Sequence, residues 1–218
     1  MIQSIAYFTM KLNPRPIKSK KNLKSPIDES HFSIISGDWR RRKLAFPCTQ
    51  GLRPTPNRAR ETLFNWLQDE VHERHCLDLF AGSGALGFEA LSRGASSCLF
   101  LDNEPDVVRA INANLRLLKC QKGKAIQAFL PQHIHQLAAA KVFDLVFLDP
   151  PYGNTKWIEQ IIQPLIEGKK LTQDAFIYIE TAKKDPKLNL SHYLNLHREK
   201  CFGQVNGHLF KVNKSVIV

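Results

Sequence analysis

Three glycines and an aspartate within Cys76–Leu91 have the types and spacing of a ligand-binding turn between a strand and a helix. Gly82 permits a tight reversal of the chain, Gly84 lets the backbone approach a ligand, and Gly87 brings the helix against the strand. Asp78 stands just before this turn, where a phosphate-binding site would have no use for a carboxylate. The acid therefore favours a ligand that carries positive charge. The alternative is an ordinary turn with a solvated acid before it.

S-adenosylmethionine meets this requirement, because it carries an ammonium and a sulfonium group and has no pyrophosphate for the helix N-terminus to hold. Asp78 would bind the ammonium group. Asp102 ends the next apolar run, twenty residues after Gly82, where a second parallel strand would present a carboxylate to ribose hydroxyls. The cofactor contacts predicted from this part of the chain are Asp78, Phe80, Gly82, Ser83, Gly84, Gly87, Asp102 and Asn103.

A second stretch that could carry chemistry is Val146–Tyr152, in which an apolar strand runs into an acid, two prolines and an aromatic residue. Proline fixes φ and donates no backbone hydrogen bond, so Asp149 and the Pro150 carbonyl become rigid acceptors. Such acceptors hold the N–H bonds of an exocyclic amine and take up charge as its nitrogen is methylated. Tyr152 would stack on the base and align the amine with the methyl donor. The predicted catalytic residues are Asp149, Pro150, Pro151 and Tyr152.

The elements that must position these residues alternate between strand and helix from His75 onward. The predicted strands are 76–80, 97–102, 124–129, 143–148 and 174–180, and the predicted helices are 85–93, 105–119, 132–140 and 155–167. This alternation predicts an α/β fold with a mostly parallel sheet covered on both faces. Ligands of such sheets bind at the carboxyl ends of the strands, where Asp78, Asp102 and Asp149 all fall.

The C-terminal part departs from this alternation. Tyr193–Phe202 and His208–Ile217 are two β-prone runs, and Asn206-Gly207 between them is a strong hairpin signal. We therefore expect an antiparallel hairpin that closes the parallel sheet at one of its edges.

The positive charge is concentrated near the N-terminus. The whole chain of 218 residues has a formal net charge of +11, and residues 1–60 hold 13 basic against 3 acidic residues, so +10 of this charge lies there. A nearly neutral body with a basic front indicates a polyanionic partner, with nucleic acid as the leading candidate. The chain has no run of about 18 apolar residues and no signal-peptide pattern. We expect a monomeric cytoplasmic protein without a membrane span.

The basic N-terminal part of the chain is predicted to have two segments. Residues 1–30 form a basic flexible tail, and residues 31–70 form a nucleic-acid-binding hairpin and helix. Residues 71–218 form the catalytic domain. The hairpin has its turn at Ser36-Gly37-Asp38 and its second strand at Trp39–Phe46, and the helix begins after Thr55 and Pro56. The predicted nucleic-acid contacts are Trp39, Arg40, Arg41, Arg42, Lys43, Arg53, Arg58 and Arg60.

The five cysteines are scattered along the chain and include no C-x-x-C pair, which argues against a disulfide framework and against a zinc site. His72, His75 and Cys76 are close in sequence but have no fourth ligand at a suitable spacing. We predict no bound metal.

Five segments together resemble a known family: SGDWRRRKLAFP, GLRPTPNRARETLFNWL, DLFAGSGALGFEALSRGA, FLDPPY and LHREKCFGQVNGHLFKV. They are similar to RsmD, the bacterial 16S ribosomal RNA guanine-N2 methyltransferase, over roughly residues 33–213. The GLRPT and RETLFNWL block is the most specific part, because many amino-methyltransferases share the glycine turn and the D-P-P-Y tetrad.

The resemblance implies a Rossmann-like methyltransferase fold with S-adenosylmethionine as cofactor. The implied substrate is a guanine of 16S ribosomal RNA, either in the RNA itself or in a small-subunit assembly particle. Related proteins often carry a polar or acidic residue after the third strand to meet the adenine amino group, and Gln127 is the candidate here. The tetrad ends in Tyr152 where the family commonly has Phe, a change that preserves stacking.

Three other functions fit parts of the sequence. A methyltransferase of adenine N6 or cytosine N4 would also use D-P-P-Y, but one that acts on DNA normally has a larger target-recognition region. An NAD-dependent oxidoreductase would accept the glycine pattern but leave Asp78 and the tetrad without a task. A non-catalytic RNA-binding protein on the same fold would have no reason to retain both acids and the intact tetrad. These considerations favour a ribosomal RNA (guanine-N2)-methyltransferase.

Overall fold

The computed structural model describes residues 29–48, 57–137, 142–151 and 153–216, and most of its strands belong to one large sheet. These strands are β3 His75–Leu79, β4 Ser97–Asp102, β5 Gly123–Gln127, β6 Phe143–Leu148, β7 Leu171–Ala182, β8 Leu194–Phe202 and β9 Val205–Val212. Their order across the sheet is β5-β4-β3-β6-β7-β9-β8. The strands from β5 to β7 pair in parallel, whereas β9 is antiparallel to both of its neighbours. The predicted α/β architecture with an antiparallel C-terminal closure is confirmed.

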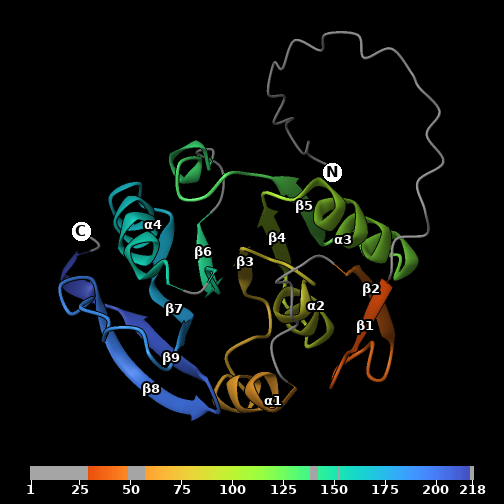
Figure 1. Cartoon of the computed structure of the whole chain (residues 1–218), viewed down its shortest axis with the longest axis horizontal. Helices are drawn as coiled ribbons and strands as arrows, with labels where there is room; N and C mark the ends of the chain where they lie inside the picture. Colours follow the sequence, from red (N-terminus) through yellow and green to blue (C-terminus); the bar gives the residue numbers. More distant parts are fainter. Residues whose placement is uncertain (1–28, 49–56, 138–141, 152, 217–218) are drawn as a thin grey trace, which may run out of the picture.

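Helices cover both faces of this sheet (Figure 1). The helices α1 Asn57–Trp66, α2 Ala85–Ser92 and α3 Pro105–Leu117 lie on one side, and α4 Thr155–Glu167 lies on the other. Each side has its own apolar core, with Phe88 buried in the first and Ile161 in the second. Successive strand residues point to opposite faces, so β6 contributes Phe147 to the first core and Leu148 to the second.

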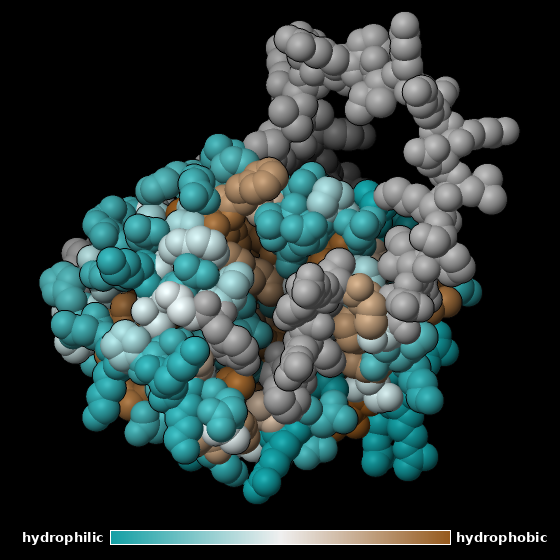
Figure 2. Space-filling view, viewed as in Figure 1, coloured by the Kyte–Doolittle hydropathy of each residue, from teal (hydrophilic) through white to brown (hydrophobic). Residues whose placement is uncertain are grey.

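The outer surface is mostly hydrophilic on the face shown in Figure 2, and apolar surface is visible in a hollow near the middle of this face. No helix in the described ranges is long and apolar enough to cross a membrane. The strands β4 and β6 and the helix α4 have the predicted bounds.

The helix predicted at 132–140 is wrong over the residues that the structure describes. Only one short turn, η1 Ile134–Gln136, follows β5 before residue 138, and residues 138–140 lie outside the described part. This turn is sufficient to bury Ile134 in the core beneath α4. The burial of Ile134 therefore does not require a longer helix.

The turn of the C-terminal hairpin also differs from the prediction. It lies at Gly203-Gln204 and not at Asn206-Gly207, since Phe202 pairs with Val205. Gly203 has a φ of +64°, which suits the first central position of a type II′ turn. Gly207 lies inside β9 instead, where a Cβ atom would be 2.6 Å from the hydroxyl oxygen of Tyr178. This glycine permits a close approach and does not form a turn.

The predicted N-terminal hairpin packs on the outside of α2 and α3 (Figure 1). It consists of β1 Glu29–Ser33 and β2 Lys43–Pro47. The backbone N–H groups of Ile35 and Ser36 donate to the Glu89 carboxylate on α2, at 2.8 and 3.0 Å. The side-chain amide of Asn114 on α3 donates to the Ala45 carbonyl at 2.8 Å. The hairpin is therefore attached to the helices and not directly to the large sheet.

Candidate active site

The turn that follows β3 carries the glycines singled out in the sequence. Gly82 and Gly84 have φ values of +52° and +74°, a region that glycine enters without the steric cost of a side chain. The N–H of Gly82 donates to Oδ2 of Asp102 at 2.8 Å, and the N–H of Glu104 donates to Oδ1 at 2.9 Å. Asp102 thus ties the glycine turn to the end of β4. Each of its oxygens has a further lone pair that a ribose hydroxyl could use.

Asp78 lies in β3, and only 3% of its surface is exposed. Its Oδ2 accepts the N–H of Gly87 at 2.9 Å. Burial raises the pKa of Asp78 well above its ordinary value, the hydrogen bond from Gly87 opposes this shift, and the charges of Asp149 and Asp102 add to it. A buried carboxyl of this kind gains most from a positively charged ligand. The residues present therefore fit the ammonium group of S-adenosylmethionine.

Gly87 acts on this site through Asp78. It lies in the first turn of α2, where a Cβ atom would be 2.2 Å from Cε1 of Phe100 on β4. The missing side chain lets the helix approach the sheet, which is the role predicted for the third glycine. The same close approach brings the Gly87 N–H to the Asp78 carboxylate. Ser83, in the turn between these elements, is also buried.

Asp149 follows β6 directly, at the carboxyl end of the strand. Loss of hydration raises the pKa of Asp149 to about 7. Pro150 is buried and Pro151 is exposed, and the backbone and side-chain N–H groups of Asn154 donate to the Pro151 carbonyl at 3.3 and 3.2 Å. Tyr152 lies outside the described residues, so its stacking role stays a prediction.

An aromatic stack joins the end of β3 to the helix α4, which follows Asp149 in the chain. The Phe80 ring, half-buried at the end of β3, stacks on Trp157 of α4, with centroids 5.8 Å apart and planes inclined by 14°. The strands β3 and β6 are also neighbours in the sheet, so Asp78 and Asp149 lie near the carboxyl ends of adjacent strands. A carboxyl that suits a cationic ligand thus lies near a second carboxyl that could accept a hydrogen bond from an amine. The sequence analysis did not name Trp157, although its position shortly after the tetrad is a usable signal.

Asn103 and Gln127 lie side by side at the ends of β4 and β5. The Gln127 side-chain amide donates to the Asn103 carbonyl at 2.9 Å, and both side chains are exposed. They could border a ligand that binds over Asp102. The contact of Gln127 with adenine stays a prediction.

Two further residues of the site were missed by the sequence analysis. Tyr178 and Glu180 on β7 are 0% and 2% exposed, and the Tyr178 hydroxyl donates to Oε1 of Glu180 at 3.0 Å. Burial raises the pKa of both groups. The signal was present, because Glu180 is an acid at the end of a predicted apolar strand, like the three aspartates that were selected.

The prediction that the basic residues of the hairpin lie on its second strand is correct only for Lys43. Arg40, Arg41 and Arg42 belong to the turn between β1 and β2, and the second strand begins at Lys43. The half-buried Trp39 side chain packs against the core, and the backbone N–H of Trp39 donates to Oγ of Ser92 at 3.0 Å, which holds this segment in a turn. The three arginines and Lys43 are exposed.

This basic turn lies at the end of the sheet opposite Asp149. It contacts Ser92, the last residue of α2, and this helix begins at the carboxyl end of β3 and runs back toward the amino end. A helix of this length spans about 12 Å. Nucleic acid bound by the arginines would therefore have to extend across the domain to place a base at Asp149.

Arg60 was predicted to contact nucleic acid, and this prediction is wrong because the side chain is completely buried. Its guanidinium donates to the Ser33 carbonyl at 2.8 Å and to Oδ1 of Asn57 at 2.7 Å, and it lies 5.3 Å from the centroid of the Phe32 ring. Arg60 joins α1 to the hairpin. Arg58 is exposed on α1, and Arg53 lies outside the described residues.

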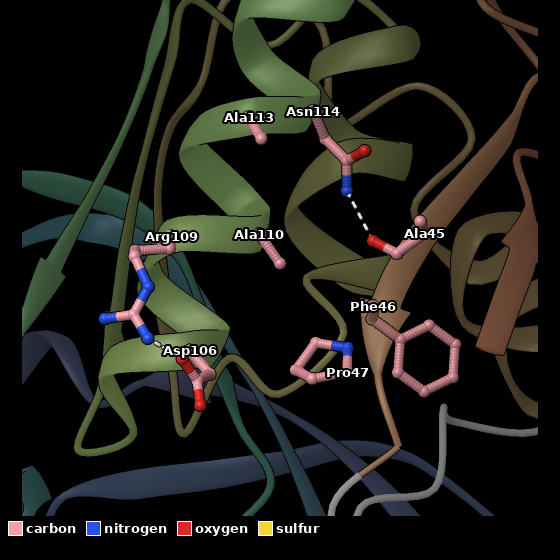
Figure 3. A pocket seen from close by; sticks show the side chains of 8 residues that line it. All are labelled: Ala45, Phe46, Pro47, Asp106, Arg109, Ala110, Ala113 and Asn114. Carbon is pink, nitrogen blue, oxygen red and sulfur yellow. Dashed lines mark hydrogen bonds and ion pairs between the residues drawn. The ribbon is translucent and has the colours of Figure 1, made fainter. Parts of the chain in front are cut away.

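A cavity of about 270 Å³ lies between β2 and α3 (Figure 3), and its lining does not include Asp78, Asp102 or Asp149. It is lined by Ala45, Phe46, Pro47, Asp106, Arg109, Ala110, Ala113 and Asn114. Asn114 and Ala45, which line this cavity, are joined by the hydrogen bond between α3 and β2 (Figure 3).

Comparison with known proteins identifies the family. A family model described as "Conserved hypothetical protein 95" matches residues 32–211. The ribosomal RNA small subunit methyltransferase D of Haemophilus influenzae is 40% identical over 193 residues, which cover 88% of this chain and 99% of that protein. The protein of the same name in Escherichia coli is 38% identical over 178 residues, or 82% and 88% of the two chains. The chain belongs to this family.

A comparison with solved structures supports the fold. A methyltransferase structure from Escherichia coli has a TM-score of 0.76 and 36% identity, and the match covers 85% of this chain and 99% of that one. The predicted Rossmann-like methyltransferase fold is confirmed, and with it the prediction of an enzyme of this class.

Proposed function

We propose that this protein transfers a methyl group from S-adenosylmethionine to the exocyclic N2 amino group of a guanine in 16S ribosomal RNA. The observation that carries the proposal is the pair of acids at adjacent strand ends, Asp78 for a cationic donor and Asp149 for an amine, in a chain of this family. The names of the relatives support the small-subunit RNA as substrate. The D-P-P-Y tetrad supports an amino group as the acceptor.

The roles of the residues follow from their environments. The bound cofactor would supply a methyl group on a sulfonium centre. Asp78 would bind the ammonium group of that cofactor, and Asp102 would hold the ribose while it keeps the glycine turn closed. Asp149 and the Pro150 carbonyl would accept the N–H bonds of the target amine, and Asp149 would take the proton that the nitrogen loses. These hydrogen bonds strengthen as positive charge develops on the nitrogen, so they lower the barrier to methyl transfer.

The RNA partner also accounts for the position of the exposed cations. A guanine amino group in paired or stacked RNA is reached only after the base is extruded, and the flanking backbone must be held meanwhile. Arg40, Arg41, Arg42 and Lys43 would bind phosphates at a distance from the extruded base. We propose that the partner is the RNA within a small-subunit assembly particle in the cytoplasm. A large substrate of this kind can reach from the basic turn at one end of the strands to Asp149 at the other.

The direct test is incubation with labelled S-adenosylmethionine and either ribosomal RNA or small subunits, followed by nucleoside analysis. We expect N2-methylguanosine from the wild type and a much slower accumulation of it from Asp149→Ala. N6-methyladenosine or N4-methylcytosine would refute the guanine assignment and support the corresponding amino-methyltransferase. RNA binding without any methylation would support a non-catalytic binding protein.

A further inference from the structure

The end of β7 holds a buried acid to which the proposed reaction assigns no task. Glu180 is 2% exposed and accepts a hydrogen bond from the fully buried Tyr178 hydroxyl at 3.0 Å. Gly207 on the adjacent β9 is paired with Glu180, and a Cβ atom there would be 2.6 Å from the Tyr178 hydroxyl. The glycine on the neighbouring strand thus leaves room for the Tyr178 hydroxyl that donates to Glu180.

The strand register brings Glu180 next to Asp149. The strands β6 and β7 run in parallel with Phe147 opposite Tyr178 and Leu148 opposite Ile179. The next residues along the two strands are Asp149 and Glu180. Because strand side chains alternate between faces, these two acids lie on the face that buries Phe147 and Tyr178.

The surroundings of the two carboxyls add negative and not positive charge. Burial raises the pKa of Glu180 well above its ordinary value, the charge of Asp149 raises it further, and the hydrogen bond from Tyr178 opposes the shift. Asp78 on β3 contributes a third acid, whereas β9 presents only Gly207 opposite Glu180. Neither Asp149 nor Glu180 forms an ion pair with another described residue. Two such carboxyls ionise in steps that belong to the pair, and the second step is costly because like charges face each other.

We propose that Glu180 is a positioning residue that keeps one proton within the carboxyl pair, so that the single negative charge resides on Asp149. The inference rests on the proposed function, in which Asp149 accepts the N–H of the target amine. As the bond between sulfur and the methyl carbon breaks and the bond from nitrogen to that carbon forms, the nitrogen becomes cationic. One of its N–H protons then passes to the Asp149 carboxylate and leaves a neutral methylated amine. An ionised Glu180 would instead favour a protonated Asp149, which cannot accept this proton.

The protonation of Glu180 can be measured without RNA or cofactor, by carbon-13 NMR of protein labelled at the glutamate Cδ. We expect the resonance that disappears in Glu180→Gln to stay at the position of a protonated carboxyl at neutral pH. Titration of this resonance near the ordinary glutamate pKa of about 4.3 would overturn the inference.

Thermal denaturation tests the same assignment independently. A glutamate that is neutral when folded and ionised when unfolded stabilises the protein fully below its unfolded pKa, and this stability is lost as the pH rises toward the folded pKa. The melting temperature of Glu180→Gln relative to wild type should therefore rise between about pH 5 and about pH 8. Glu89→Gln is the matched control, because the Glu89 carboxylate accepts hydrogen bonds from Ile35, Ser36 and Arg93. That control should be less stable than wild type at pH 8, and a difference for Glu180→Gln that does not change with pH would contradict the inference.

Turnover distinguishes positioning from general stability. We expect Glu180→Ala to lower the single-turnover rate on the order of 10²-fold, because Asp149 loses its fixed neighbour, and Glu180→Gln to restore most of the rate at neutral pH. The affinity for S-adenosylmethionine should be the same in both variants. Equal losses in the two variants would overturn the inference. If the wild type methylates no RNA while the Glu180 resonance stays protonated, the proposed function fails and the shared proton stands.

Discussion

The acids Asp102 and Asp149 show how differently the two halves of the site are built. Each oxygen of Asp102 accepts a backbone N–H, from Gly82 or from Glu104, and these hydrogen bonds oppose the rise in the pKa of Asp102 that burial causes. Asp149 has a pKa of about 7 and is adjacent to a second carboxyl in the strand register. Holding a cofactor requires a fixed acceptor, whereas taking a proton requires a group whose pKa is near the working pH. The contrast therefore separates binding from chemistry along one edge of the sheet.

The largest expected effect comes from removing the acid of the chemical half. Asp149→Ala should lower turnover by about 10²- to 10³-fold while the affinity for S-adenosylmethionine hardly changes, because its contact strengthens only as charge develops on the amine. Single-turnover rates and calorimetry on the same protein measure the two quantities. Normal methylation by this variant at saturating cofactor would mean that Asp149 is only a turn residue.

The binding half should give the opposite pattern. Asp78→Ala and Asp102→Ala should each weaken S-adenosylmethionine binding by roughly 1–3 kcal/mol, since each removes a hydrogen bond to a partly buried charged or hydroxyl group. Calorimetric titration gives the affinities, and turnover at saturating cofactor should fall much less than in Asp149→Ala. Tight binding of NADH by the wild type, without binding of S-adenosylmethionine, would contradict the assignment of the glycine turn.

The pH dependence of each half should sharpen the comparison further. The single-turnover rate should fall up to about tenfold per pH unit below pH 7, because protonated Asp149 cannot accept a proton. Binding of S-adenosylmethionine should tighten as the pH rises, because its ammonium group requires the ionised form of Asp78, whose pKa is raised in the free protein. Rapid-quench rates and calorimetry across a pH series measure these trends. An affinity that is independent of pH, with no proton released on binding, would place the ammonium group elsewhere.

The smallest effect should come from the basic turn, which is remote from both halves. Replacing Arg40, Arg41, Arg42 and Lys43 by glutamine should reduce the log–log salt slope of RNA binding by about 1 for each phosphate that the variant no longer binds. The affinity for S-adenosylmethionine should not change. Deleting residues 1–26 is the control and should cost much less, and filter binding across a salt series compares both proteins. An unchanged slope in the glutamine variant, together with a large decrease in RNA affinity in the deletion, would move the RNA-binding segment to the tail.

The features that could be predicted from the sequence are those that depend on neighbouring residues in the chain. The strands β4 and β6, the glycine turn and the acids at the strand ends follow from apolar runs, turn residues and a period of two or of 3.6. The family resemblance added the substrate class. Glu180 also lies at the end of a predicted apolar strand, as Asp78, Asp102 and Asp149 do, so the local pattern marks it as a candidate site residue as well.

The errors arise where a distant part of the chain decides the local structure. Arg60 is buried because β1 provides the Ser33 carbonyl and the Phe32 ring, which no pattern within α1 reveals. Gly207 resembles a turn residue, but it is required by the Tyr178 hydroxyl on another strand. Gly37 lies against the Ser92 backbone, which fixes the basic turn at the amino end of the sheet. Such contacts are tertiary, and propensity cannot supply them.

The hairpin of β1 and β2 is attached to α2 and α3, so its strand pairing is separate from that of the large sheet. Glu89 and Asn114 hold β1 and β2 through hydrogen bonds to the backbone, whereas no strand of the hairpin is paired with the large sheet. Opening of the hairpin therefore breaks no hydrogen bond between β3, β4 and β6. In native-state hydrogen exchange, the amides of β1 and β2 should exchange at a lower free energy than those of the central strands. The pairing of β1 with β2 can therefore be lost while the strands that carry the cofactor turn stay paired.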